Sequence, residues 1–206
     1  AVTTEGASTA KNKEAMSTLS LAEAGTYYLG GTPNNNYIFK IQVTESEAAV
    51  VNNYVLEANT LTAVPEKGTF TDGQEVKYDD YFTIYMSANT KIDSSTKEWA
   101  DGYTSSQRLN LGGKADVSTP KNVVAFKTEG TATVKIWWVE GGESDRELAI
   151  FTADGTQVAV TTEGASTAKN GEAMSTLTLE NPGTYYLGGT PNNNYIFKIE
   201  VTDTVG

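Results

Sequence analysis

The stretch Thr131–Glu140 reads TATVKIWWVE, and it decides the fold of this chain. Two sets of side chains alternate along it, Val134, Ile136 and Trp138 in the first and Lys135, Trp137 and Val139 in the second. Successive side chains of a β-strand point to opposite faces of its sheet, so this period of two predicts a strand with Trp138 in the core. Trp137 is then either an exposed platform for stacking a sugar or part of a central strand that is buried on both faces.

Stretches of similar character lie on both sides of this one. Those expected to be strands are Ala15–Leu21, Thr26–Leu29, Tyr37–Val43, Asp80–Ser87, Ser106–Leu111, Val123–Thr128 and Glu147–Thr152. Those expected to be loops are Asn89–Gly102, Gly112–Asn122 and Gly164–Gly171. An Asp-Gly pair at 154–155 predicts a hairpin turn. About eight to ten short strands, with turns every eight to twelve residues or so, predict an all-β chain folded as an antiparallel β-sandwich or jelly roll.

A long segment of the chain occurs twice. Ala1–Thr44 returns as Ala159–Thr202, and 38 of the 44 aligned residues are identical. The six differences are Lys13/Gly171, Ser20/Thr178, Ala22/Glu180, Glu23/Asn181, Ala24/Pro182 and Gln42/Glu200. We therefore expect residues 1–44 to be the C-terminal fragment of an upstream copy of the same domain, 45–51 to be a linker, and 52–206 to be one complete β-sandwich.

Composition excludes several kinds of chemistry. The chain has no Cys and no His, which removes disulfides, thiolate metal sites and any Ser–His–Asp arrangement. No apolar run approaches the roughly 18–20 residues that cross a bilayer. Acidic pairs such as Asp79-Asp80 match no EF-hand loop. We expect no enzymatic activity, no metal site and no cofactor, with a structural calcium ion left open.

Charge is unevenly placed along the chain. The net charge of −11 argues against nucleic acid and anionic membranes as partners. From Lys91 to Lys135, however, the sequence contains seven cations and five anions. The net charge of this window is therefore +2, and that of the rest of the chain is −13. Binding residues of a β scaffold concentrate in its loops. Flexible cations in these loops suit the carboxylates of an acidic polymer. The alternative is that these lysines only keep the loops soluble. Trp99, beside Lys97 in an expected loop, is the better candidate for stacking a sugar.

Several blocks of sequence resemble one known family. They are DYFTIYMSANTKIDSSTKEWADGYTSSQRLNLGGK at 80–114, KNVVAFKTEGTATVKIWWVEGG at 121–142, AKNGEAMSTLTLENPGTYYLGG at 168–189 and NNNYIFKIEVT at 192–202. In this order they resemble the pectin-binding family 77 carbohydrate-binding modules that are attached to bacterial pectate lyases. The resemblance implies a secreted, non-catalytic β-sandwich that binds low-ester homogalacturonan without needing calcium, through lysines that contact the uronate carboxylates.

The resemblance also implies particular site residues. The lysine of the GGK block is Lys114 and that of the AKNG block is Lys169, while the TKIDSSTK loop offers both Lys91 and Lys97. Arg108 is a further candidate. Lys11 is the counterpart of Lys169 in the first copy, without the rest of the site.

Two other functions stay open at the level of sequence. Near-identical tandem copies also suit a structural or adhesive repeat domain of a bacterial surface protein. A lyase that uses Lys or Arg as its base is a third hypothesis. Residues 1–44 and 159–202 carry nearly the same strands, so one hypothesis is that they compete for one place in the sandwich and that the displaced copy adds to a neighbouring molecule by domain swapping or head-to-tail association. The alternatives are that residues 1–44 pack alone with their own partial sheet, or that they are disordered.

Overall fold

The computed structural model describes residues 16–21, 25–30, 38, 40–44, 49–61, 69–142, 145–162 and 171–206. The chain divides into two compact units, Ala1–Glu45 and Ser46–Gly206. All strands found among the described residues belong to the second unit. The expected loop 164–171, which contains Lys169, lies outside the described residues except for Gly171.

The second unit is built from two sheets, here called sheet A and sheet B, in which neighbouring strands are antiparallel. In the described residues, sheet A has the order β10-β7-β12-β5-β4, with β1 also paired to β12, and sheet B has the order β2-β3-β6-β11-β8-β9. The strands of sheet A are β1 (Val50–Glu57), β4 (Lys91–Glu98), β5 (Thr104–Asn110), β7 (Thr131–Glu140), β10 (Ala173–Leu179) and β12 (Asn194–Val205). Those of sheet B are β2 (Glu75–Lys77), β3 (Thr83–Tyr85), β6 (Val123–Thr128), β8 (Glu147–Thr152), β9 (Gln157–Val160) and β11 (Gly183–Thr190). A short 3-10 helix, η1 (Ala58–Thr60), follows β1.

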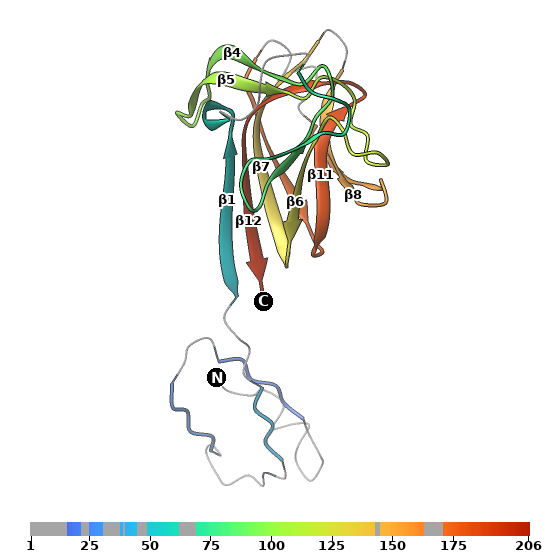
Figure 1. The fold of residues 1–206 in the computed structure, drawn as a ribbon. Helices are drawn as coiled ribbons and strands as arrows, with labels where there is room; N and C mark the ends of the chain where they lie inside the picture. Colours follow the sequence, from blue (N-terminus) through green and yellow to red (C-terminus); the bar gives the residue numbers. More distant parts are fainter. Residues whose placement is uncertain are drawn as a thin grey trace. The chain divides into compact units, whose positions relative to one another are not determined.

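The strand β12 organises sheet A. It pairs with β7 along nearly its whole length. On its other side it pairs with β5 at Tyr195 and Ile196, and with β1 from Lys198 to Val205. Figure 1 shows β1 and β12 side by side, with the end of β12 next to the start of β1. β12 is therefore held in sheet A by β1, β5 and β7, which lie far away from it in the sequence.

The core lies between the two sheets. Side chains with no exposed surface come from both, among them Ile136, Trp138 and Ile199 of sheet A and Ile84, Ile150 and Leu187 of sheet B. Burial of each such side chain contributes about 1.5–3 kcal/mol to folding. The predicted antiparallel β-sandwich or jelly roll is confirmed, as is the placement of Trp138 in the core.

A second apolar cluster covers the other face of sheet A. Its buried members are Trp99, Trp137, Val139 and Phe197, with Tyr103 and Tyr195 packed against them. Of the two alternatives for Trp137, the structure selects the central strand that is buried on both faces, because this ring is 1% exposed.

Tyr195, Phe197, Ile199 and Val201 alternate with other residues along the last repeated strand, and the structure interrupts this alternation in β12. A bulge lies between Ile196 and Lys198, so Phe197 has no partner in the register with β7. An extra residue in one strand reverses the facing of everything beyond it. Phe197 therefore joins the outer cluster, whereas Ile199 and Val201 enter the core, instead of all three sharing one face.

One expected loop is a strand. Most of Asn89–Gly102 forms β4, which pairs with β5 at the edge of sheet A. An edge strand buries little, and β4 carries polar residues at most positions, so its sequence shows no apolar alternation. By contrast, β6, β7 and β8 begin and end at the residues predicted for them.

Candidate functional site

Three charged side chains meet on the hairpin of β4 and β5. Asp93 is the register partner of Arg108, and its two carboxylate oxygens accept from Lys91 Nζ at 2.8 Å and Arg108 Nη2 at 3.2 Å. Burial raises the pKa of the Asp93 carboxyl, but hydrogen bonds and charge from both cations outweigh that effect and hold the pKa below its usual value. Two cations share one anion, so the group carries one net positive charge.

An aromatic ring supports the arginine of this group. The Arg108 guanidinium carbon lies 3.5 Å from the centroid of the Tyr195 ring, and Tyr195 is half-buried on β12. A planar guanidinium stacks well on an aromatic face, which fixes its orientation. The Arg108 Nε atom is buried, and no hydrogen-bond partner is found for it in the described part of the chain. Tyr195 is a residue that sequence reasoning missed, because its contact with Arg108 depends on the pairing of β12 with β5.

Lys114 lies in the loop that follows β5. Its side chain is exposed, and no acidic partner is found for it among the described residues. The loop itself is anchored, because Asn122 Nδ2 donates to the Lys114 carbonyl at 2.9 Å and the Ala115 N–H donates to the Gly189 carbonyl at 2.9 Å. The anchored loop thus holds an exposed ammonium group that is not paired with a carboxylate of the described residues.

The start of this loop is tied to the end of β5. The Gly112 N–H donates to Asn110 Oδ1 at 2.9 Å, and Gly112 has a φ of +88°. A Cβ on Gly112 would lie 2.6 Å from the backbone of Asn89, so a residue other than glycine does not fit there. Asn110 is the register partner of both Lys91 and Tyr195. Lys91 and Arg108 therefore lie near one end of the β4–β5 hairpin, and the loop that carries Lys114 starts from that end.

A fourth cation stabilises the neighbouring turn. Arg146 Nη1 donates to the Gly141 carbonyl at 2.8 Å and to Asn193 Oδ1 at 3.0 Å. Asn193 Nδ2 in turn donates to Asn110 Oδ1 at 3.3 Å. This chain of hydrogen bonds joins the start of β12 to the end of β5.

Lys97 lies at the opposite end of β4. It is six residues from Lys91, or about 20 Å along a strand. Its Nζ is 3.0 Å from Glu172 Oε1, and this hydrogen bond lowers the pKa of the Glu172 carboxyl. The structure does not bring Lys97 together with Lys91. Lys169 and Lys11 lie outside the described residues.

Trp99 is not the exposed ring expected from the sequence. It is 3% exposed, and its Nε1 donates to the Ala173 carbonyl of β10 at 2.9 Å. The ring packs edge-on against Phe197, with 4.8 Å between the ring centroids. Because the polypeptide after β4 turns back over sheet A, this ring closes the outer cluster and has no free face for stacking a sugar.

Two further lysines lie over the outer cluster. Lys135 Nζ and Lys198 Nζ are 4.4 Å and 4.5 Å from the Trp137 ring centroid. Both are also paired with carboxylates, Lys135 with Asp101 and Lys198 with Glu57 and Glu200. Acidic partners and the aromatic ring account for their charges, so we assign them a structural role.

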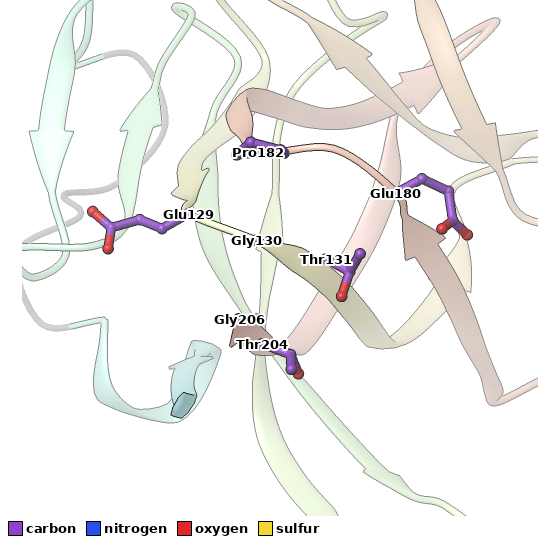
Figure 2. A pocket seen from close by; sticks show the side chains of 7 residues that line it. All are labelled: Glu129, Gly130, Thr131, Glu180, Pro182, Thr204 and Gly206. Carbon is purple, nitrogen blue, oxygen red and sulfur yellow. The ribbon is translucent and has the colours of Figure 1, made fainter. Parts of the chain in front are cut away.

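A shallow depression of about 460 Å³ lies elsewhere, beside the hairpin that joins β6 and β7. Figure 2 shows Glu129 and Glu180 on opposite sides of it, with Pro182 and Gly206 between them. Its charged lining residues are acidic, so it does not suit an anionic ligand. Asp203 fixes the hairpin from within by accepting from the N–H groups of Glu129 at 2.7 Å and Gly130 at 3.0 Å.

Neither a cluster of metal-binding side chains nor a membrane-spanning helix is found among the described residues. They contain no group of three or more acidic side chains arranged to hold a metal ion. The described part of the chain also has no helix with the length and apolarity that crossing a bilayer requires.

Comparison with known proteins gives distant structural likenesses only. No family model and no curated protein matches the chain. One similar solved structure comes from work titled "The complexity of the Ruminococcus flavefaciens cellulosome reflects an expansion in glycan recognition", with 16% identity, a TM-score of 0.42 and coverage of 75% of this chain and 97% of that one. A second is the CBM22-1 xylan-binding domain from Paenibacillus barcinonensis Xyn10C, with 9% identity, a TM-score of 0.40 and coverage of 78% and 98%. A third is a family 35 carbohydrate-binding module from Clostridium thermocellum, with 15% identity, a TM-score of 0.31 and coverage of 58% and 96%. These likenesses are too distant to assign a ligand to this chain.

Proposed function

We propose that the sandwich is a non-catalytic carbohydrate-binding module for acidic plant cell-wall polysaccharide, namely low-ester homogalacturonan. In this proposal it directs an attached pectin-degrading enzyme, secreted by a bacterium, to its substrate. The observations that support it most are the exposed Lys114 in the loop after β5, and Lys91 and Arg108 on the β4–β5 hairpin that leads into this loop. Lys169 and Lys97 complete the proposed set on the strength of the sequence resemblance.

The energetics fit a weak, multivalent site. Each exposed ion pair contributes about 0.2–1 kcal/mol. Three or four such pairs contribute about 0.6–4 kcal/mol and hydrogen bonds from Arg108 add to this, so we expect a Kd on the order of 1 mM, which corresponds to about 4 kcal/mol. An ammonium group accepts many approach directions, which suits carboxylates that repeat along a flexible polymer. Asp93 competes with the ligand, because it already occupies Lys91 and Arg108.

The first experiment measures retention on polygalacturonate at low and high salt. We expect binding that weakens with salt, and a several-fold loss for Lys114→Ala and for Lys169→Ala. Lys127→Ala is the matched control, since Lys127 is an exposed cation on β6 of sheet B. Fully esterified pectin serves as the uncharged ligand. Parent-like binding by both Lys114→Ala and Lys169→Ala would refute the site.

The second experiment uses the competing carboxylate. Asp93→Asn frees Lys91 and Arg108, so the affinity for polygalacturonate should rise roughly two- to fivefold. Isothermal titration with oligogalacturonates measures this change, with Asp154→Asn, in the turn between β8 and β9, as the control for net charge. An unchanged affinity in Asp93→Asn would mean that the β4–β5 hairpin does not contact the ligand.

A second candidate function is a structural or adhesive tandem-repeat domain that exchanges strands between molecules. The exposure of repeated apolar residues in the first unit favours it, for example Val43 at 84%. It predicts oligomers in light scattering and no affinity for any member of a glycan array. A lyase activity is the third candidate, and release of unsaturated products from polygalacturonate at alkaline pH with calcium would support it.

A further inference from the structure

Identical residues of the two copies have opposite environments. Leu29 is 58% exposed whereas Leu187 is fully buried, and Ile41 is 60% exposed whereas Ile199 is fully buried. The residues of the first copy thus carry an apolar surface that, in the second copy, completes both sheets of the sandwich. That surface requires the same partners as β11 and β12, which are the strands of residues 46–158.

The differences between the copies leave this surface intact. Within the described strands of the second copy only two positions differ, Thr178 and Glu200, and neither is buried. Buried positions such as Leu179, Ile196 and Val201 are the same residues as Leu21, Ile38 and Val43 of the first copy, aligned in that order. Either copy therefore supplies the same core side chains.

The connection to β1 allows the first copy to take this place within its own chain. In the observed register Asn53 is opposite Thr202 and Leu56 is opposite Ile199. If the first copy adopted that register, Thr44 would lie opposite Asn53, and Glu45 opposite Asn52. Residues 46–51 would then form a six-residue connection, one residue longer than the common hairpin loops of about two to five residues. Figure 1 shows that β1 and β12 already lie side by side as such a hairpin would require.

We propose that the repeated segment ending at Thr44 exchanges with the one ending at Thr202 inside a single chain. Residues 46–158 then form a complete sandwich either with the copy that precedes them in the sequence or with the copy that follows them, as in a circular permutant. The observed arrangement has two advantages, because Asp203 caps the β6–β7 hairpin and β1 pairs as far as Val50 with Val205. Glu45 replaces that Asp in the first copy and is one methylene longer. The exchanged form is therefore the minor one until the second copy is damaged.

The decisive experiment damages one copy at a time in the full chain. Leu187→Asp puts a charge into the centre of sheet B, between β6 and β8. We expect this variant to keep a cooperative unfolding transition and a near-ultraviolet circular dichroism spectrum, as a monomer in light scattering. Leu29→Asp alone should resemble the parent. The double variant Leu29→Asp/Leu187→Asp should lose both signals.

Introduced cysteines identify which copy is paired with β1, since the chain has no others. Asn53 Oδ1 and Thr202 Oγ1 are 2.8 Å apart, so Asn53→Cys/Thr202→Cys reports the observed form. Asn53→Cys/Thr44→Cys reports the exchanged form, and we expect at least a fivefold increase in its intrachain disulfide when Leu187→Asp is added. Unfolding of Leu187→Asp to the extent of the double variant overturns the proposal, as does a double variant that stays folded. A disulfide between residues 44 and 53 of different chains overturns exchange within one chain and supports swapping between molecules.

Discussion

Residues 16–44 and 174–202 share nearly one sequence but differ in what surrounds them. In the second copy, Tyr185 and Leu187 of β11 lie between β6 and β8, and β12 lies between β7 and β1. In the first unit no strand is found among the described residues, and the equivalent Tyr27 is 51% exposed whereas Tyr185 is 5% exposed. The difference shows that the burial of these residues is determined by strands more than about 30 residues away, which neither copy carries itself.

The largest contrast is expected from one truncation made in each copy. With the observed form locked by the Asn53→Cys/Thr202→Cys disulfide, Ile199→Ala should lower the free energy of unfolding by about 2–5 kcal/mol, because it leaves a cavity in the core. Ile41→Ala should change it by less than about 0.5 kcal/mol. Urea denaturation measures both. Reduction of the disulfide should shrink the gap, since the chain can then exchange its copies. Equal losses of stability from the two truncations would contradict the difference in burial between Ile199 and Ile41.

A repeated glycine gives the next largest contrast. A Cβ on Gly188 would lie 2.7 Å from the Ala115 Cβ and from the Asn122 carbonyl oxygen, whereas a Cβ on Gly30 meets nothing within 4 Å. Gly188→Ala should therefore cost about 1–3 kcal/mol by overpacking. Gly30→Ala should be nearly neutral. Thermal unfolding of the two variants checks this, and a neutral Gly188→Ala would show that the loop carrying Lys114 moves freely.

One natural difference between the copies predicts a smaller effect. Glu200 Oε1 lies 2.5 Å from Lys198 Nζ, and the first copy has Gln42 at this position. Glu200→Gln should lower the free energy of unfolding by about 0.2–1 kcal/mol, since the pair is partly exposed to solvent. Gln42→Glu is the matched change and should have no measurable effect. Added salt should reduce the loss in Glu200→Gln, and a loss that ignores salt would contradict the ion-pair explanation.

Acid should destabilise the sandwich in several small steps, one for each carboxyl group whose pKa is lowered. The pKa values of Asp93, Asp101 and Glu172 are all lowered, and the described residues of 16–44 include no acid. A lowered folded-state pKa contributes stability that is present above the ordinary value and is lost as the pH falls through the folded value. Stability should thus decrease progressively from about pH 5 downward. Denaturation midpoints measured from pH 7 to 2 check this, and Glu172→Gln should flatten part of the decline.

Local sequence predicted three strands that are rich in apolar residues and bounded by clear turns. Val123–Thr128, Thr131–Glu140 and Glu147–Thr152 are bounded by Gly, Asp or Pro within a few residues, and the structure confirms their ends. β4 was missed because an edge strand needs no apolar face. β1 begins at Val50, inside the segment expected as a linker, because its first residues pair with the end of β12.

The candidate site was predictable only in part. The exposure of Lys114 follows from its place in a Gly-rich loop after a strand. The pairing of Lys91 and Arg108 with Asp93 depends on the β4–β5 register, which includes a bulge between Ser94 and Lys97. The burial of Trp99 depends on the Ala173 carbonyl, 74 residues away. These contacts are long-range, so no local pattern in the sequence reveals them.

The position of β12 in the middle of sheet A has a consequence for how the protein is made. Ribosomes release the chain from its N-terminal end, so β1, β5 and β7 leave the exit tunnel well before the strand that joins them. Sheet A therefore cannot close around its native last strand until translation has passed Val205. During that interval the only residues already synthesised that match this strand are those of the first copy.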